Sequence, residues 1–127
     1  TVTEDRILPD RDAEGKVTVS LERLSKLPTA FACNCDVTAY VLLNALKENG
    51  IRVPEDVSVV GFDDYILADL AVPSLTTYAI DVDHMAKVSA QQLIRRIQKP
   101  EAEVRRIVVS GKLVIRESVQ KHSGNTA

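Results

Sequence analysis

Residues 53–64 read Val-Pro-Glu-Asp-Val-Ser-Val-Val-Gly-Phe-Asp-Asp, and this stretch gives the clearest indication of the fold. Residues 57–60 form a short apolar run rich in β-branched side chains, which predicts a buried parallel strand. Gly61 lets the backbone turn where the strand ends, and the carboxylates of Asp63 and Asp64 follow at once. Ligands of open α/β sheets gather at the carboxyl ends of the strands, so this stretch brings acidic side chains to the edge where a functional site is expected.

A strand and a helix are predicted directly before this stretch. Residues 29–33 are small and apolar, which predicts a second strand. Asp36 occupies the position of a helix N-cap, where a carboxylate accepts hydrogen bonds from free backbone N–H groups. The helix is expected to reach about Asn49 and to stop at Gly50. Together these elements predict a right-handed βαβ unit. The residues expected to be buried on the helix are Val37, Val41, Ala45 and Leu46.

The segments on either side of this unit have weaker patterns. Residues 6–9 are expected to form a short strand or the end of one, and residues 10–15 a polar loop. Residues 16–27 fit both a helix and a strand, and their length favours a helix. Residues 65–77 have no clean period.

A long helix and two strand-like runs are predicted near the C-terminus. Asp83 can cap a helix that reaches Lys99 and is ended by the following proline. Residues 106–109 and 113–116 are strand-like, and residues 122–127 are expected to be a frayed tail. The apolar stripe of the helix consists of Val82, Ala86, Ala90, Leu93 and Ile97, widened by Met85 and Ser89. The small residues in this stripe permit close approach to another element.

Length and composition limit the classes of protein. The 127 residues suffice for one domain with a hydrophobic core, and a hydrophobic content of 45% is ordinary for a globular protein. A net charge of −2 gives no electrostatic reason to expect DNA binding by this segment itself. No apolar run has the length of a membrane span, and residues 1–6 lack the features of a signal peptide. A cytoplasmic location without membrane partners is therefore expected.

Four features stand in a fixed order along the chain: residues 28–31 (Pro-Thr-Ala-Phe), Asp36 at the start of a helix, residues 53–64, and residues 73–77 (Pro-Ser-Leu-Thr-Thr). Together they resemble the effector-binding core of the lactose-repressor (LacI/GalR) family of bacterial transcription regulators. Their order and spacing match together, which is a stronger signal than any one of them. The resemblance extends over about residues 28–118.

The resemblance implies an α/β fold, a Rossmann-like parallel sheet flanked by helices. This sheet would form one lobe of a two-lobed, type I periplasmic-binding-protein-like sensor. Because the family's sensor needs a considerably longer chain, the sequence is expected to be a fragment, with the long helix crossing to the other lobe. The implied division is residues 1–64 for βα units of the C-terminal lobe, 65–100 for a crossover segment and helix, 101–120 for returning strands and 121–127 for a tail.

Asp36 is the first candidate for effector binding. A carboxylate accepts two charge-assisted hydrogen bonds, which suits the hydroxyl or N–H donors of a small molecule. From the residues alone a plain helix cap is favoured, whereas the resemblance implies a contact with the effector. Asn34 and Cys35 precede Asp36 and are expected to line the same site, although many relatives have Asn where Cys35 stands. Tyr65 is interpreted either as a stacking surface for a sugar or base or as an ordinary half-buried tyrosine.

The adjacent carboxylates Asp63 and Asp64 have three interpretations. They line the edge of a ligand cleft, cap the hinge where the chain leaves the lobe, or bind a metal such as magnesium for phosphoryl chemistry. No further acidic cluster or catalytic lysine accompanies them, so the hinge or cleft edge is favoured.

No cofactor, metal or catalytic residue is predicted. Cys33 and Cys35 lack the usual spacing of a closed zinc site and do not suit a structural disulfide, so they are interpreted as buried small hydrophobic residues. His84 is expected at the surface, and His122 has no recognisable partner motif. The sequence has no nucleophile elbow, no P-loop and no GxGxxG motif.

The predicted function is that of a non-enzymatic sensor in a LacI-type DNA-binding regulator, usually a repressor. The effector is expected to be a sugar or a related small molecule, DNA to be bound through a headpiece absent from this chain, and the protein to be a homodimer. The alternatives are a periplasmic sugar-binding protein of the same fold and an enzyme that uses Asp63 and Asp64. The stripe around Ala90 and Leu93 is expected to be exposed and to promote dimers, by exchange of the helix at residues 83–99.

Overall fold

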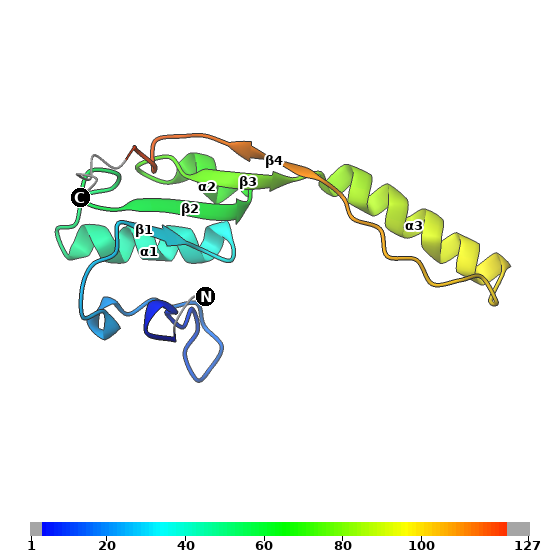
Figure 1. Ribbon diagram of the computed structural model, residues 1–127, viewed down its shortest axis with the longest axis horizontal. Helices are drawn as coiled ribbons and strands as arrows, with labels where there is room; N and C mark the ends of the chain where they lie inside the picture. The colour runs from blue at the N-terminus through cyan, green and yellow to red at the C-terminus, as the bar shows by residue number, and fades with distance from the viewer. Residues whose placement is uncertain (1–3, 122–127) are drawn as a thin grey trace, which may run out of the picture.

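The computed structural model describes residues 4–121 and contains a four-stranded sheet (Figure 1). The strands follow the order β1-β2-β3-β4 across the sheet. The first three are parallel, and β4 pairs antiparallel with β3. The predicted α/β class is therefore confirmed, with one antiparallel strand at an edge of the sheet. The strands are β1, Ala30–Ala32; β2, Ser58–Asp63; β3, Thr76–Ile80; and β4, Gly111–Val114.

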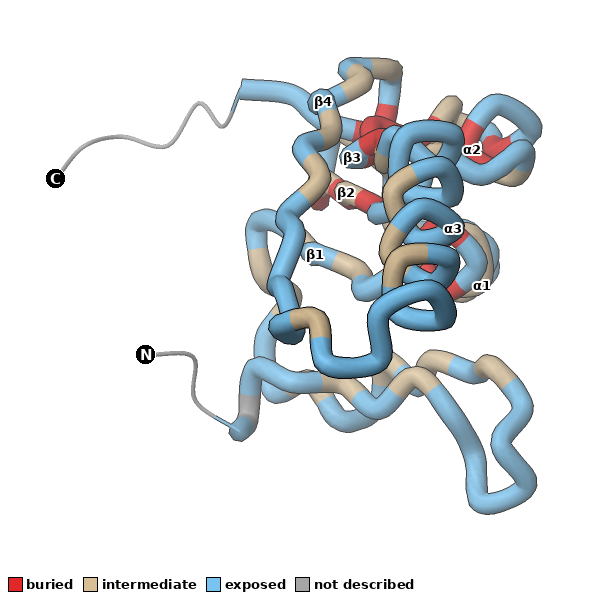
Figure 2. The backbone as a smooth tube through the Cα atoms, turned by 90° about the vertical axis from the view of Figure 1, so that its right-hand side faces the viewer, coloured by how far each residue is buried: buried red, intermediate tan, exposed pale blue. Residues whose placement is uncertain are grey.

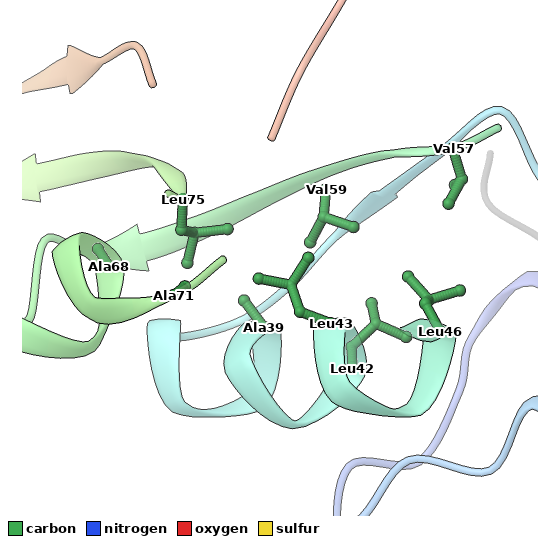
Figure 3. Close-up of a cluster of buried hydrophobic side chains, with 9 residues drawn as sticks. All are labelled: Ala39, Leu42, Leu43, Leu46, Val57, Val59, Ala68, Ala71 and Leu75. Carbon is green, nitrogen blue, oxygen red and sulfur yellow. The ribbon is translucent and has the colours of Figure 1, made fainter. Parts of the chain in front are cut away.

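Helices α1 and α2 cover one face of this sheet, and the hydrophobic core lies between them and the strands (Figure 2). The helices are α1, Asp36–Glu48; α2, Ile66–Leu70; and α3, Val82–Gln98; short 3-10 turns occur at Glu4–Arg6 and Leu21–Arg23. The buried core residues are Ala39, Leu42, Leu43, Leu46, Val57, Val59, Ala68, Ala71 and Leu75 (Figure 3). Side chains of successive strand residues point to opposite faces, so the other face of the sheet carries a separate set of residues. On that face Phe62 and Tyr78 stack with their ring centroids 5.6 Å apart, and both remain exposed.

The predicted strand–helix–strand unit is present as β1, α1 and β2. Gly50 follows α1 with a φ of 71°, which is the left-handed conformation that a stop glycine adopts. The predicted buried face of α1 is wrong in part, because Val37 is exposed while Leu42 and Leu43 are buried beside Leu46. Both sides of this helix are apolar, and the position of the sheet decides which side is covered.

The two predicted helix caps are displaced. Asp36 is the first residue of α1 rather than its cap, and Cys35 holds the N-cap position without a side-chain hydrogen bond to the free backbone N–H groups of the helix. For α3 the cap is Asp81, whose carboxylate accepts a hydrogen bond from the backbone N–H of His84 at 2.9 Å. Asp83 lies in the first turn of α3, where its negative charge is favourable to the helix dipole. Because Asp36 does not cap α1, its carboxylate makes contacts outside that helix.

The helix predicted at residues 16–27 is wrong. Only Leu21–Arg23 forms a single 3-10 turn, and Val17 instead pairs with Arg11 in an isolated antiparallel bridge. Residues 17–19 are Val-Thr-Val, and β-branched side chains lose rotamer freedom in a helix. The strand expected at residues 6–9 is also absent.

The C-terminal half contains one strand that the sequence did not predict and lacks one that it did. β3 lies within and beyond the stretch that had no clean period. Residues 106–109 do not form a strand, because the last pair between β3 and β4 joins Ile80 to Gly111 and no strand partner remains beyond it. β4 begins at Gly111, two residues before the predicted strand. The tail predicted at residues 122–127 lies outside the described residues.

Residues 81–110, which we call the arm, project away from the sheet (Figure 1). The chain enters the arm from β3 at Ile80 and returns into β4 at Gly111, and these two residues are paired across the strands. No residue of α3 is buried. The expectation that the apolar stripe of this helix is left exposed is therefore confirmed, with Leu93 and Ile97 exposed by 62% and 70%.

Candidate functional site

The carboxyl ends of β1, β2 and β3 lie at one end of the sheet, where α1 also begins (Figure 1). We call this end the carboxyl edge. Asn34 and Cys35 follow β1, while Asp63, Asp64 and Tyr65 end or follow β2. The structure thus gathers at one edge the residues that the sequence predicts for the site.

Asp36 lies at this edge but faces inward. Its side chain is fully buried. One carboxylate oxygen accepts a hydrogen bond from the Tyr65 backbone N–H at 2.7 Å, and the other accepts one from the Thr77 hydroxyl at 2.6 Å. A direct contact between Asp36 and an effector stays a prediction, because in this conformation both oxygens bind the protein itself.

Gly61 makes room for the buried carboxylate of Asp36. A Cβ atom at this position of β2 would collide with an Asp36 oxygen and with the Leu75 side chain. The sequence presents Gly61 as a simple turn at the end of a strand, whereas the structure uses it inside β2 for close approach.

Asp63 is the exposed carboxylate of the carboxyl edge. Its backbone has a φ of 112°, which L-residues rarely adopt. Partial burial of the carboxyl group and the nearby negative charge of Asp36 raise the pKa of Asp63. Among the described residues, none forms a hydrogen bond or an ion pair with this carboxylate. It can therefore accept hydrogen bonds from a small molecule.

Asp64 has a different role from its neighbour. With a φ of 57° it turns the chain back over the sheet. Its carboxylate pairs with the guanidinium of Arg116 at 2.8 Å, and the same nitrogen of Arg116 also pairs with Asp69 of α2 at 2.8 Å. Arg116 was not predicted as part of the site. The signal that pointed to it was an arginine directly after an apolar strand-like run, on the face that packs against helices.

The remaining predicted site residues divide into exposed and packed ones. Tyr65 is 58% exposed, as a stacking surface requires. Asn34 is exposed and donates a hydrogen bond to the Asp10 carboxylate at 2.8 Å, which holds the pKa of Asp10 below its ordinary value. Cys35 is half-buried, with its sulfur 3.4 Å from the Thr38 hydroxyl. Asn34 and Tyr65 therefore join Asp63 as groups that a ligand can reach.

One thiol and one carboxylate of the carboxyl edge are already accounted for within the protein. Burial, together with Cys35 and Asp36, raises the pKa of the Cys33 thiol to about 12, so it stays protonated. Asp64 is already paired with Arg116. Within residues 4–121, no three His, Cys, Asp or Glu side chains gather closely enough to hold a metal ion.

Comparison with known proteins identifies the family. A model of the periplasmic binding protein-like domain matches residues 2–119. The chain belongs to the periplasmic binding protein-like family. The resemblance to LacI/GalR regulators is also confirmed, because the relatives of the chain are LacI-family repressors.

Three relatives illustrate the similarity. The repressor PurR of Vibrio parahaemolyticus is 36% identical over 123 residues, covering 94% of this chain and 37% of that protein. The structure of the transcriptional regulator CelR in complex with cellobiose matches with a TM-score of 0.71 and 35% identity, over 77% of this chain and 30% of that one. The lac repressor dimer bound to operator matches with a TM-score of 0.68 and 29% identity, over 75% and 33%. The chain thus spans about a third of the length of these relatives.

Two surface hollows of the chain lie away from the carboxyl edge. One lies between residues 12–19 and the second half of α1, and the other lies near Gly50 and Pro73. Neither includes a predicted site residue. In the described part of the chain, no helix is both long and apolar enough to cross a membrane.

Proposed function

We propose that this chain is a lobe of the effector-sensing domain in a LacI-type transcription regulator, usually a repressor. The observation that carries the proposal is the carboxyl edge, where exposed polar groups stand beside the paired strands that lead into the arm. A small molecule bound there contacts the lobe next to the point where the chain crosses into the arm. The LacI-family relatives support this function over a periplasmic transport role or an enzyme that uses Asp63 and Asp64.

The mechanism is a shift between conformations of the sensing domain. A ligand held between this lobe and a second one stabilises whichever closure state it binds more tightly. Its effect on DNA binding is limited by the difference between its affinities for the two states. The arm is the part of this chain that reaches toward the second lobe, because its apolar stripe has no partner within the described residues.

The effector is proposed to be a sugar or another small molecule rich in hydroxyl groups. Asp63 accepts hydrogen bonds from its hydroxyl groups, Asn34 adds a polar contact, and Tyr65 provides an apolar ring for stacking. The cellobiose bound by CelR supports this choice of ligand class. Asp36 acts from beneath, by fixing the Tyr65 backbone.

The protein is proposed to bind rather than catalyse. DNA contact is assigned to a headpiece outside this chain, because a net charge of −2 offers no attraction for phosphates. Operators with two half-sites are read by paired headpieces, which implies a homodimer in the cytoplasm. The lac repressor dimer bound to operator supports this assembly.

The coding sequence upstream of Thr1 gives the first test. A helix-turn-helix segment followed by another α/β lobe is expected. A secretory signal peptide in that place would overturn the regulator and favour a periplasmic sugar-binding protein.

Isothermal titration of the product of the whole reading frame with cellobiose and with D-ribose gives the second test. At least one probe is expected to bind, and Asp63→Asn is expected to weaken that binding about tenfold or more, because a charge-assisted acceptor is lost. The matched control is Asp56→Asn, which alters an exposed carboxylate just before the opposite end of β2. An unchanged affinity in Asp63→Asn would remove Asp63 from the site.

A further inference from the structure

The turn that presents Asp63 is held in an unfavourable backbone conformation. Asp63 and Asp64 are consecutive non-glycine residues with φ values of 112° and 57°. Such conformations persist only where the surrounding structure holds them in place. The contacts that hold residues 63–65, which we call the acidic turn, therefore decide where the Asp63 carboxylate points.

The first set of contacts comes from beneath the turn. The fully buried Thr77 hydroxyl donates to Asp36 at 2.6 Å and accepts from the Asp64 backbone N–H at 3.4 Å. Asp36 in turn accepts from the Tyr65 backbone N–H. α1 and β3 are thus both attached to the backbone of the acidic turn.

The second set of contacts comes from Arg116, which follows β4. One guanidinium nitrogen pairs with Asp64 at 2.8 Å, and the other donates to the Leu75 backbone oxygen at 3.0 Å. The Arg116 backbone N–H donates to the Thr76 hydroxyl at 2.9 Å. The Arg116 side chain is only 15% exposed. A planar guanidinium with two fixed partners has a fixed orientation as well as a charge. A lysine ammonium carries the charge but has no such fixed orientation.

The acidic turn is also continuous with the strands that carry the arm. Asp63 pairs with Ala79 of β3, and Ala79 pairs with Lys112 of β4. The next pair along these strands is Ile80 with Gly111, where the arm begins and ends. Arg116 thus connects the acidic turn to the same strand by which the chain returns from the arm.

We propose that Arg116 is a positioning residue that, through Asp64, holds the acidic turn in its left-handed conformation and so orients the Asp63 carboxylate. That the partner of Asp63 is an effector rests on the proposed function. The hold of Arg116 and Asp64 on the acidic turn, which we call the clamp, does not rest on it. The guanidinium of Arg116 is taken up by contacts with Asp64, Asp69 and the Leu75 backbone oxygen. It acts through the bond to Asp64, and the bond to Leu75 fixes the direction from which it acts.

Amide hydrogen exchange, followed by NMR in the whole 127-residue chain, tests the clamp without any ligand. The reporters are the N–H groups of Asp64 and Tyr65, which donate to Thr77 and Asp36. The internal reference is the Cys33 N–H, which donates to Val60 across β1 and β2, away from Arg116. Arg116→Gln is expected to speed exchange at the two reporters by about tenfold, with little change at Cys33.

Four further variants make the result specific. Arg116→Lys keeps the charge but loses the planar fork, so its exchange rates should lie between those of the wild type and Arg116→Gln. Asp64→Asn should reproduce Arg116→Gln, and the double variant should add little to either one. The matched control is Asp69→Asn, which removes the 70% exposed partner of Arg116 and should change the rates by less than about twofold.

Unchanged rates at Asp64 and Tyr65 in both Arg116→Gln and Asp64→Asn would overturn the proposal. An equal acceleration at Cys33 would also overturn it, because that pattern is a general loss of stability rather than release of one turn. Should Arg116→Gln not fold, Asp64→Asn and Arg116→Lys decide the question by the same criteria. A failure to bind cellobiose or D-ribose would count against the proposed function only, since no ligand enters these measurements.

Discussion

The body of the molecule and its arm contrast in how their helices are used. In the body, the thirteen-residue helix α1 places Leu42, Leu43 and Leu46 against the sheet. In the arm, α3 has seventeen residues and buries none of them. Both helices have an apolar side, yet only that of α1 is covered by other residues of the described range 4–121. An apolar stripe therefore indicates a surface suited to packing against another element. Whether that element lies in the same segment of chain depends on the fold.

The contrast is tested most strongly by replacing one leucine in each region with alanine. Leu46→Ala in the body is expected to lower the free energy of unfolding by about 2–5 kcal/mol, because it leaves a cavity at a fully buried site. Leu93→Ala in the arm is expected to change it by less than about 0.5 kcal/mol, because the side chain is 62% exposed. Urea unfolding followed by circular dichroism measures both. Similar losses in the two variants would show that α3 packs against the body in solution.

A polar substitution tests the same contrast on a smaller scale. Thr77→Val keeps the shape of the side chain but removes the hydroxyl that donates to the buried Asp36 carboxylate. The expected loss is about 1–3 kcal/mol, because one carboxylate oxygen is left without its donor. The control is Ser89→Ala in the exposed arm, for which a change within about 0.5 kcal/mol is expected in the same urea experiment. A neutral Thr77→Val would mean that water replaces the lost bond.

Association should distinguish the arm from other exposed apolar positions. We expect the chain to form dimers through the α3 stripe, because exposed apolar stripes promote association. Leu93→Glu should shift the mass measured by light scattering toward the monomer. The control is Leu70→Glu, whose residue in α2 is 65% exposed and lies outside the stripe, and it should leave the mass unchanged. A monomeric wild type at high concentration would contradict this prediction.

The smallest expected effect is a pH dependence at the surface of the body. The Arg52 side chain and backbone N–H donate to the Asp56 carboxylate and lower its pKa from 3.8 to about 2. A carboxyl group whose pKa is lower in the folded state stabilises the fold above its unfolded pKa. This contribution is lost as the pH falls from about 3.8 toward 2. The stability difference between wild type and Asp56→Asn should therefore shrink over that range. A difference that does not shrink between about pH 3.8 and 2 would contradict this explanation, and the effect should be small because the pair is exposed.

Local chemistry that depends on neighbouring residues was predictable from the sequence. The run before Gly61 predicted β2, and the position of Gly50 predicted the end of α1. β3 escaped prediction because its sequence, Thr-Thr-Tyr-Ala-Ile, lacks the continuous apolar run of a buried strand. Its threonines are nonetheless buried, since their hydroxyl groups bind partners from other elements.

The candidate site was predictable in location but not in the roles of its residues. The motif order placed Asn34, Asp36, Asp63, Asp64 and Tyr65 at one edge, and the structure brings them there. Nothing local in the sequence distinguishes the buried carboxylate of Asp36 from the exposed one of Asp63. That difference depends on Thr77 and Arg116, which lie 41 and 52 residues away from their partners Asp36 and Asp64. Long-range partners of this kind have no period or spacing to reveal them.

The paired strands at Ile80 and Gly111 give the arm the properties of a lever. A single strand would hold the arm at one end only, whereas two hydrogen-bonded strands hold both of its ends to the sheet. A Cβ atom at Gly111 would collide with the Ala79 backbone oxygen, so the two strands approach each other without a side chain between them. A seventeen-residue helix is about 25 Å long, so a rotation of about 10° at this joint, about an axis across the helix, carries its far end through about 4 Å. A small adjustment beside the acidic turn thus becomes a displacement as large as a side chain at the end of the arm.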